Sequence, residues 1–190
     1  MTAEQTVPGD MPRSSPSGPP LQVVVMGVSG TGKTSVASAV AEAGDYDFVE
    51  GDVHHPRANV EKMSAGIPLT DEDRKPWLEI LAGLLAEHRE QGRAAVLACS
   101  ALKRSYRDIL RGDAPVDATF FLHIDLPYDV LLDRMEKREH FMPASLLQSQ
   151  FDTLERLDDD EHGAVLDADE PLVDVVERAI AAVRAAGHTD

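Results

Sequence analysis

Short apolar runs alternate along the chain with longer segments of helical periodicity. The runs that suit buried strands are Leu21–Met26, Tyr46–Glu50, Ala94–Cys99, Ala118–Ile124 and Ala164–Leu166. Strands of a parallel sheet are covered on both faces, so they appear in a sequence as brief, nearly continuous apolar runs. Five strands are therefore expected.

The segments between these runs have apolar residues at helical spacing. They predict helices over Lys33–Ala43, Arg57–Ser64, Thr70 to about Glu90, Lys103–Arg111, Tyr128–Arg138, a segment starting near Pro143, and Pro171–Ala186. Strands that alternate with helices indicate an α/β fold, here a doubly wound parallel sheet of about five strands flanked by helices.

Helix starts and apolar stripes add local expectations. Thr70 precedes Asp71-Glu72-Asp73, which predicts an N-cap followed by acidic residues in the first turn. Asp169 is expected to cap the last helix. The inward stripes are expected to include Ile80 in the long helix and Leu172 in the last one.

Residues 1–20 have a different composition, rich in Pro, Ser and Gly and without apolar periodicity. They predict a disordered leader. Residues 21–190 are expected to form a single domain, because a chain of 190 residues is within the usual size of one core.

Charge and cysteine content exclude several functions. Lys and Arg total 18 and Asp and Glu total 34, a net charge of −16, which argues against binding to nucleic acid or to an anionic membrane. Cys99 is the only cysteine, so an internal disulfide and a multi-thiolate metal site are excluded, and a reducing cytoplasm is expected. No apolar stretch approaches the length of a membrane-spanning helix.

A phosphate-binding motif joins the first strand to the first helix. The motif G-x-x-x-x-G-K-[ST] is matched by Gly27, Val28, Ser29, Gly30, Thr31, Gly32, Lys33 and Thr34. Its backbone N–H groups are expected to hold the phosphates of ATP, Lys33 to reach the β- and γ-phosphates, and the Thr34 hydroxyl to ligate Mg²⁺. The alternative is a chance glycine-rich turn with Lys33 as a solvated helix start.

Other nucleotide-dependent classes fit less well. The Asn-Lys-x-Asp segment of guanine-reading switches is missing, since the single asparagine, Asn59, stands in NVEK. The apolar run that ends at Asp125 has one acid rather than the Asp-Glu pair of motor and transporter ATPases. A compact kinase acting on a small molecule remains, and such an enzyme needs an acceptor pocket and a mobile cationic lid.

Candidate acceptor residues follow the second and third strands. Asp52 is expected at the ligand edge of the sheet, where its carboxylate could accept the proton of an attacking hydroxyl or hold that hydroxyl in line. Its alternative role is to cap the next helix. His55 is expected to contact substrate, whereas His54 is equally well explained as a surface residue. Ser100 is expected at the same edge.

Two cations are further acceptor candidates. Arg74 follows the acidic helix start, and it is either an exposed charge that balances those acids or a guanidinium that grips a substrate carboxylate. Lys103 lies beyond the third strand and is expected at the ligand edge. Cys99 is expected to be a buried small apolar residue, not a nucleophile.

Arg134, Lys137 and Arg138 form a basic cluster just before a break marked by Pro143. They predict a mobile lid at about 134–150, which would exclude water and neutralise the transferring phosphoryl group. A basic helix C-terminus that interacts with its own dipole is the alternative.

Together these segments resemble the gluconokinase family of phosphate-loop kinases. The matching words are GVSGTGKT (27–34), GDVHHPRANVEKMSAGIPLTDEDRKPWL (51–78), CSALKRSYRDILR (99–111) and REHFMPASLLQSQFDTLE (138–155), and the second and fourth are the specific ones. The segment after Glu155, Arg156–Glu161, departs from the family because it lacks the expected proline.

The resemblance implies phosphorylation of the 6-hydroxyl of D-gluconate with Mg·ATP, in a fold similar to that of shikimate and nucleoside-monophosphate kinases. It implies Asp52 at the acceptor hydroxyl, Arg74 and Lys103 near the substrate, and Arg134 and Arg138 in the lid, with Lys33, Asp52 and Arg138 as catalytic residues and Arg134 on the nucleotide. The family is often dimeric, so a homodimer is a possible partner state.

Two alternatives stay open. A sibling kinase for another small carboxylic acid or polyol, such as shikimate, would carry the same phosphate loop. A nucleotide-sensing module would bind ATP without acceptor turnover, although it would not need Asp52, Arg74 and the lid cations together. The cations are expected to converge on one cleft, with acids clustered elsewhere, notably at Asp158–Glu161. The segment Asp167–Pro171 is expected near the adenine.

Overall fold

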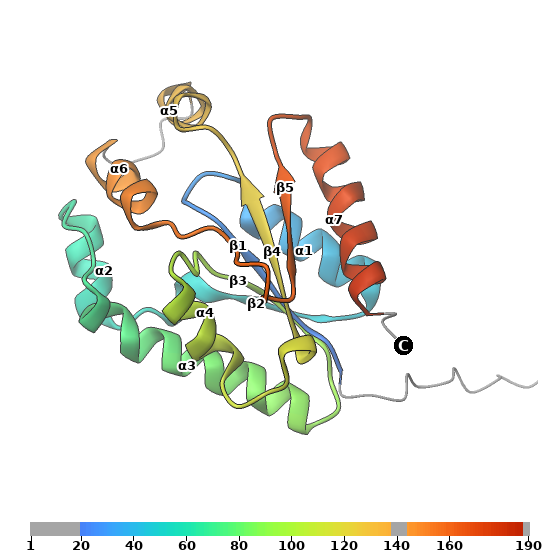
Figure 1. The fold of residues 1–190 in the computed structure, drawn as a ribbon. Helices are drawn as coiled ribbons and strands as arrows, with labels where there is room; N and C mark the ends of the chain where they lie inside the picture. Colours follow the sequence, from blue (N-terminus) through green and yellow to red (C-terminus); the bar gives the residue numbers. More distant parts are fainter. Residues whose placement is uncertain (1–19, 138–143, 188–190) are drawn as a thin grey trace, which may run out of the picture.

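A central parallel sheet organises the chain. The computed structural model describes residues 20–137 and 144–187. The sheet has five strands in the order β2-β3-β1-β4-β5, and all four neighbouring pairs are parallel (Figure 1). The strands are β1 Gln22–Met26, β2 Asp47–Glu50, β3 Ala95–Ala98, β4 Thr119–Asp125 and β5 Gly163–Asp167. The predicted fold class is confirmed.

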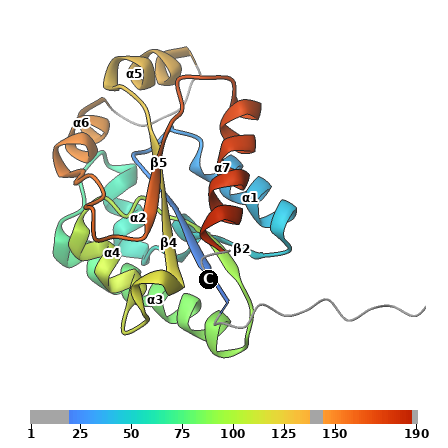
Figure 2. The same cartoon turned by 45° about the vertical axis from the view of Figure 1, so that its right-hand side comes forward.

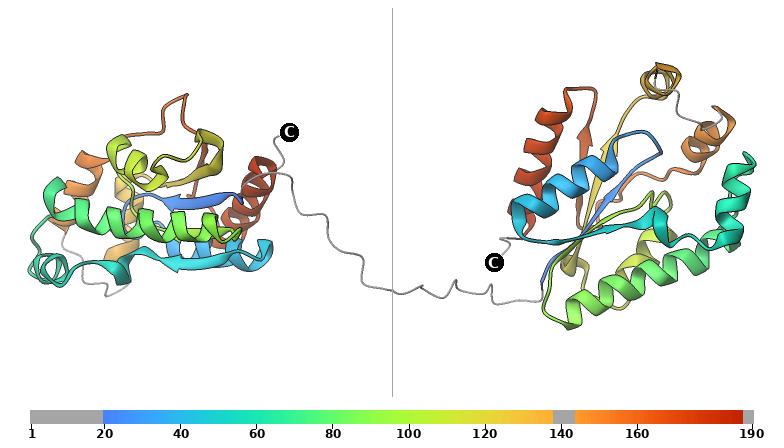
Figure 3. Two further views of the ribbon diagram at one scale, coloured as in Figure 1. Left: turned by 90° about the horizontal axis from the view of Figure 1, so that it is seen from below. Right: turned by 180° about the vertical axis from the view of Figure 1, so that it is seen from behind.

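Helices cover both faces of the sheet. They are α1 Lys33–Gly44, α2 Arg57–Ser64, α3 Asp71–Glu90, α4 Arg104–Arg111, α5 Tyr128–Lys137, α6 Ala144–Thr153 and α7 Leu172–Ala186, with short 3₁₀ turns η1 at Gly51–His54 and η2 at Val116–Ala118. Helices α1 and α7 pack together on one face, and α3 and α4 pack on the other (Figure 3). In the described part of the chain, no helix is both long and apolar enough to cross a membrane.

The core lies where the apolar runs predicted it. Val23, Val24, Val25 and Met26 of the central strand β1 are fully buried between the two helical layers. On the face of the sheet covered by α3 and α4, α3 contributes Trp77, Leu78, Leu81 and Leu85 to the core, all at 1% exposure or less. Burial on both faces explains why apolar residues dominate the central strands, although the polar residues Gln22, Thr119 and His123 are buried there as well.

The start of α3 is confirmed in detail. Thr70 is its N-cap and accepts a hydrogen bond from Asp73 N–H, while the Asp73 carboxylate accepts one from Thr70 N–H. Lys62 of α2 also donates to both Asp73 oxygens, at 2.7 and 2.8 Å. The capping box therefore also joins α2 to α3.

Three local expectations are wrong. Ile80 is 45% exposed, because the face of α3 that meets the core is narrower than the full apolar stripe. Asp169 does not cap α7, whose N-cap is Pro171 without a side-chain cap. Leu172 is 50% exposed, because the first turn of α7 is directed toward the phosphate loop rather than the sheet.

The carboxyl ends of the parallel strands meet at one edge, where α2, α5 and α6 also lie (Figure 2). Figures 1 and 3 place α2 and α6 near each other beside this edge. The predicted lid, about 134–150, includes residues that lie outside the described ranges. Of the predicted leader, 1–20, only residue 20 is described. In a doubly wound sheet this edge is where ligands bind.

Candidate active site

The phosphate loop joins β1 to α1, as predicted. Gly27 has a φ of 138°, and a Cβ at this position would lie 2.5 Å from the Ile124 backbone oxygen, so only glycine fits beside β4. Gly27 N–H donates to the Ser100 carbonyl at 3.2 Å. The Thr31 hydroxyl donates to the Val28 carbonyl at 3.1 Å, which closes the loop on itself.

Lys33 is drawn into this loop. Its Nζ donates to the Val28 carbonyl at 2.9 Å, and burial lowers its pKa, an effect that the Asp52 carboxylate opposes. A desolvated ammonium gains from a nearby anion, which phosphates would supply. A solvated helix start is therefore the wrong description of Lys33. Thr34 is exposed in the first turn of α1.

Asp52 lies in η1, directly after β2. The chain passes close to β3 at Gly51, where a Cβ would lie 2.4 Å from the Ala98 carbonyl oxygen, so a glycine is needed there. Asp52 does not cap the next helix, since α2 begins at Arg57 with Pro56 at its N-cap position. Its exposed side chain instead lines the cavity beside Lys33.

Arg74 is buried, at 8% exposure, so the alternative of an exposed helix charge is wrong. Its Nη1 donates to the Leu69 carbonyl at 2.5 Å, and its guanidinium carbon lies 5.8 Å from the centre of the Tyr106 ring. No carboxylate of the described residues forms an ion pair with Arg74. A buried guanidinium of this kind at a cavity wall is suited to bind an anionic ligand.

Trp77 and His55 form the adjoining wall. The Trp77 Nε1 donates to the Gly51 carbonyl at 2.8 Å, and the His55 ring stacks on the indole at a centroid distance of 4.0 Å. Burial lowers the pKa of His55, and the Arg74 charge lowers it further. The Asp52 carboxylate raises the pKa, but this effect is smaller than that of burial. The imidazole is therefore neutral near pH 7.

These side chains surround one cavity at the ligand edge. It is lined by Ser29, Lys33, Asp52, His55, Met63, Ile67, Pro68, Leu69, Arg74, Trp77, Ser100, Leu146, Ser149 and Gln150. Six residues predicted from the sequence are thus brought together, from the phosphate loop, the β2–α2 and β3–α4 connections and α3. The cavity joins a phosphate-binding wall to a wall with a carboxylate and a guanidinium.

Lys103 is not among the lining residues. Its Nζ donates to both oxygens of Asp71, at 2.9 and 2.7 Å, and the Tyr106 hydroxyl donates to the same carboxylate at 2.5 Å. The Lys103 charge is thus already balanced beside the cavity. Cys99 is buried as expected, and burial raises the pKa of its thiol to about 12, which suppresses its reactivity.

Arg134 does not line the cavity either, so of the described cations expected in one cleft only Lys33 and Arg74 line it. The Arg134 guanidinium donates to the Ala168 carbonyl at 3.3 Å and lies 3.8 Å from the Asp169 carboxylate. Leu172 is close to the phosphate loop, since a Cβ on Gly32 would lie 3.8 Å from its Cδ1. Arg138 lies outside the described residues.

Helix α6 contributes residues that sequence reasoning missed. Leu146, Ser149 and Gln150 line the cavity, and Gln150 Oε1 accepts a hydrogen bond from Ser29 N–H at 2.7 Å. Their spacing places them on one helix face, but the sequence does not say which element that face meets. Trp77 lies in the apolar stripe of α3, and nothing in that pattern indicates that it also lines the cavity.

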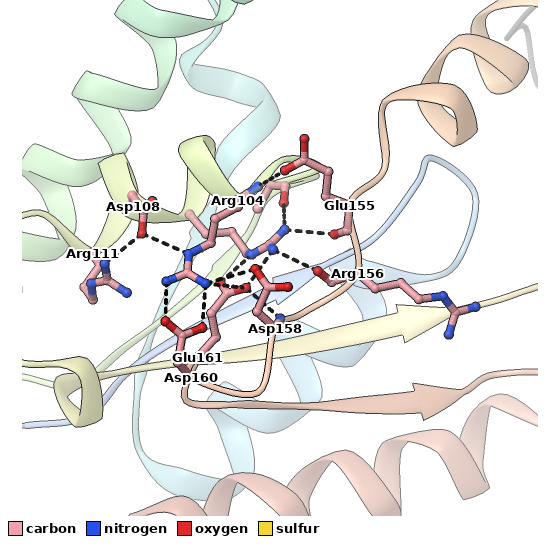
Figure 4. Close-up of polar contacts among 10 residues, drawn as sticks. Arg104, Asp108, Arg111, Glu155, Arg156, Asp158, Asp160 and Glu161 are labelled. Carbon is pink, nitrogen blue, oxygen red and sulfur yellow. Dashed lines mark hydrogen bonds and ion pairs between the residues drawn. The ribbon is translucent and has the colours of Figure 1, made fainter.

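The segment that follows α6 is fastened to α4 (Figure 4). The fully buried Arg107 donates to both carboxylate oxygens of Glu161, at 2.6 and 2.7 Å, and to the carbonyls of Glu155 and Arg156. Arg104 bonds the exposed carboxylates of Asp158 and Asp160. We name this group the acidic anchor: Arg104, Arg107, Glu155, Asp158, Asp160 and Glu161.

Comparisons with known proteins agree with this geometry. The family model described as "AAA domain" matches residues 23–157. The gluconokinase of Gluconobacter oxydans is 54% identical over 163 residues, 85% of each chain. The crystal structure of a gluconokinase from Sinorhizobium meliloti is 48% identical, with a TM-score of 0.80 over 88% of this chain and 94% of that one.

A shikimate kinase from Acinetobacter baumannii shares the fold at 13% identity, with a TM-score of 0.57 over 90% of this chain and 96% of that one. The Gluconobacter relative covers most of both chains, and the family model over residues 23–157 includes the phosphate loop and all the residues that line the cavity. The chain therefore belongs to the gluconokinase family of phosphate-loop kinases.

Proposed function

We propose that this protein transfers the γ-phosphoryl group of ATP to the 6-hydroxyl of D-gluconate, giving 6-phospho-D-gluconate and ADP. The observation that carries the proposal is the single cavity in which Lys33, Asp52 and Arg74 converge. Membership of the gluconokinase family supports the choice of acceptor. The charge of gluconate, a polyol with one carboxylate, suits a cavity in which Arg74 has no carboxylate partner among the described residues.

The transfer proceeds in line. The 6-hydroxyl oxygen forms a bond to the γ-phosphorus, the bond from that phosphorus to the β–γ bridging oxygen breaks, and ADP leaves with the electron pair. Asp52 orients the hydroxyl and accepts its proton. Lys33 and the phosphate-loop N–H groups stabilise the charge on the phosphates. Arg138 in the lid remains a proposed catalytic residue.

Mg²⁺ fits the oxygen donors at this edge. The Thr34 hydroxyl is exposed beside the loop and the Asp52 carboxylate lines the adjoining cavity. Mg²⁺ usually takes one or two protein oxygens and completes its shell with phosphates and water. Thr34 would hold the ion, which would neutralise charge on the β- and γ-phosphates.

Arg74 is the better of the two candidates for the gluconate carboxylate. It lines the cavity without a carboxylate partner among the described residues, whereas Lys103 is engaged with Asp71. On the nucleotide side, Arg134 and the segment 167–171 lie together, which supports a place for the adenosine there. A cytoplasmic location, a role in gluconate utilisation and a homodimer also remain proposals, based on the family and on the single cysteine.

An ADP-release assay across three acceptors tests the proposal. D-gluconate, shikimate and nucleoside monophosphates are each supplied with Mg·ATP, and the position of the new phosphate is found by ³¹P–¹H correlation. We expect ADP release with gluconate alone and a phosphate on C6. A rate with another acceptor but none with gluconate would refute the substrate, and nucleotide binding without any acceptor-dependent rate would favour the sensing module.

A further inference from the structure

Gln150 links α6 to the phosphate loop at the point where the donor and acceptor sides of the cavity meet. Its Oε1 accepts from Ser29 N–H at 2.7 Å, although the two residues are 121 positions apart. Both side chains line the cavity together with Lys33 and Asp52. The contact therefore spans the place where the phosphoryl group must pass to the acceptor.

The helix that carries Gln150 is fixed at its C-terminal end. Leu147 is fully buried in the core, and Glu155 N–H donates to the Leu102 carbonyl at 2.7 Å. The Glu155 carboxylate accepts from Arg104 N–H at 2.7 Å (Figure 4). The acidic anchor thus fixes the C-terminal end of α6. Gln150 lies one turn before this end, so its side chain is held in a defined position.

The chemistry of an amide suits this position. An amide has an oxygen acceptor and two N–H donors, and when Oε1 is engaged by Ser29 N–H the donors remain for a ligand. A hydroxyl of a polyol both donates and accepts, so a neutral amide can orient it without adding charge beside the phosphates. A carboxylate here would repel the phosphates, and an ammonium would bind them directly.

We propose that Gln150 is a further substrate-contacting residue: with its oxygen held by the phosphate loop, its amide N–H groups bind the hydroxyl chain of the acceptor at the reacting end. Arg74 would hold the opposite, carboxylate end. This inference rests on the proposed function, because it assigns the part of the cavity that orients a polyol acceptor. It makes Gln150 a determinant of acceptor binding and not of nucleotide binding.

The test compares Gln150→Ala and Gln150→Glu with the matched control Gln148→Ala. Gln148 lies on the same helix, but its side chain is exposed and bonds Asp152 at 2.7 Å, away from the cavity. KM for gluconate, KM for ATP, kcat and acceptor-independent ATP hydrolysis are measured for each variant, with thermal unfolding to confirm the fold.

For Gln150→Ala we expect kcat/KM for gluconate to fall about tenfold, as for the loss of one or two ligand hydrogen bonds, with KM for ATP unchanged. For Gln150→Glu we expect a fall at least as large, because the carboxylate still accepts from Ser29 N–H but cannot donate, and only this variant should also raise KM for ATP, because its charge repels the phosphates. Gln148→Ala should match the wild type. The fraction of ATP hydrolysed without phosphorylating gluconate should rise in both Gln150 variants.

Two results would overturn the proposal. A lower KM for ATP with unchanged gluconate parameters would mean that Gln150 only occupies the loop until nucleotide displaces it. Equal changes in both KM values together with a lower melting temperature would mean a structural role. The wild-type rate is measured first: if gluconate is not phosphorylated, the proposed function fails, and the same variants are compared with the acceptor that the ADP assay identifies.

Discussion

Arg107 on α4 and Arg74 on α3 are both buried on helices that pack against each other, yet they have different partners. Arg107 has no exposed surface, and both oxygens of Glu161 and several backbone carbonyls accept its hydrogen bonds. Arg74 lines the acceptor cavity and donates to the Leu69 carbonyl, without a carboxylate partner among the described residues. One positive charge is compensated inside the fold, and the other is available to a ligand.

The same contrast explains how a chain with a net charge of −16 can bind two anions. Three of the four acids at 158–161, namely Asp158, Asp160 and Glu161, pair with Arg104 or Arg107 in the acidic anchor. Net charge governs solubility and non-specific attraction, whereas the site is governed by local charge. Mutations in the cavity should therefore change the kinetic constants, whereas mutations in the acidic anchor should change the free energy of unfolding.

The largest effect is expected in the pocket, for Asp52→Asn. Asparagine keeps the shape but cannot take the proton of the attacking hydroxyl, so kcat should fall by about 10²–10⁴-fold. The side chain is exposed in the cavity, so unfolding should not change. Steady-state kinetics with gluconate measure the loss, and a kcat within threefold of the wild type would exclude Asp52 from the transfer.

In the anchor, Glu161→Gln should act on stability instead. It leaves the Arg107 guanidinium buried without its counter-charge, which costs about 3–5 kcal/mol in the free energy of unfolding. Urea unfolding measures this cost. Asp160→Asn is the matched control, since its carboxylate is exposed and bonds only at the surface, where a pair contributes about 0–1 kcal/mol.

Acidification should weaken the anchor in the wild type. Burial alone would raise the pKa of Glu161, but hydrogen bonds from Arg107 and Asp158 N–H outweigh burial, so the pKa is lowered. Its stabilisation is complete above the unfolded value, about 4.3, and is lost as the pH falls through the lower folded pKa. Unfolding free energies across this range should depend less on pH in Glu161→Gln. An identical pH dependence in the two proteins would contradict this account.

The smallest effect is expected for Lys103→Ala. The Lys103 charge is already engaged by Asp71, so KM for gluconate should change by less than about threefold, as expected for an exposed pair. Kinetics with gluconate and with ATP measure it. A rise of tenfold or more in the gluconate KM alone would show that Lys103 leaves Asp71 to hold the substrate.

Local signals in the sequence predicted much of this structure. The apolar runs located all five strands, Thr70 located the start of α3, and the motif at 27–34 located the phosphate loop. These features depend on neighbours in the chain. The orientation of Leu172 and the contact of Gln150 depend on which elements meet in space, and a helical pattern does not specify its partner surface.

For the same reason, the sequence could not show which of Arg74 and Lys103 is available to bind substrate. Both are cations near acidic residues in the sequence, and only the fold shows that Asp71 turns to Lys103 and Tyr106 while Arg74 turns to the cavity. The buried pair of Arg107 and Glu161 likewise joins residues 54 positions apart. Charge patterns alone do not reveal such pairings.

Arg74→Met tests the central distinction between the two arginines most directly. Gluconate KM and the urea unfolding free energy are measured on the same preparation. Because an uncompensated buried charge is replaced by an apolar side chain of similar length, we expect unchanged or higher stability and a gluconate KM raised by about 10- to 100-fold, with the ATP KM unchanged. A loss of stability with an unchanged gluconate KM would contradict the account, because Arg74 would then serve the fold as Arg107 does.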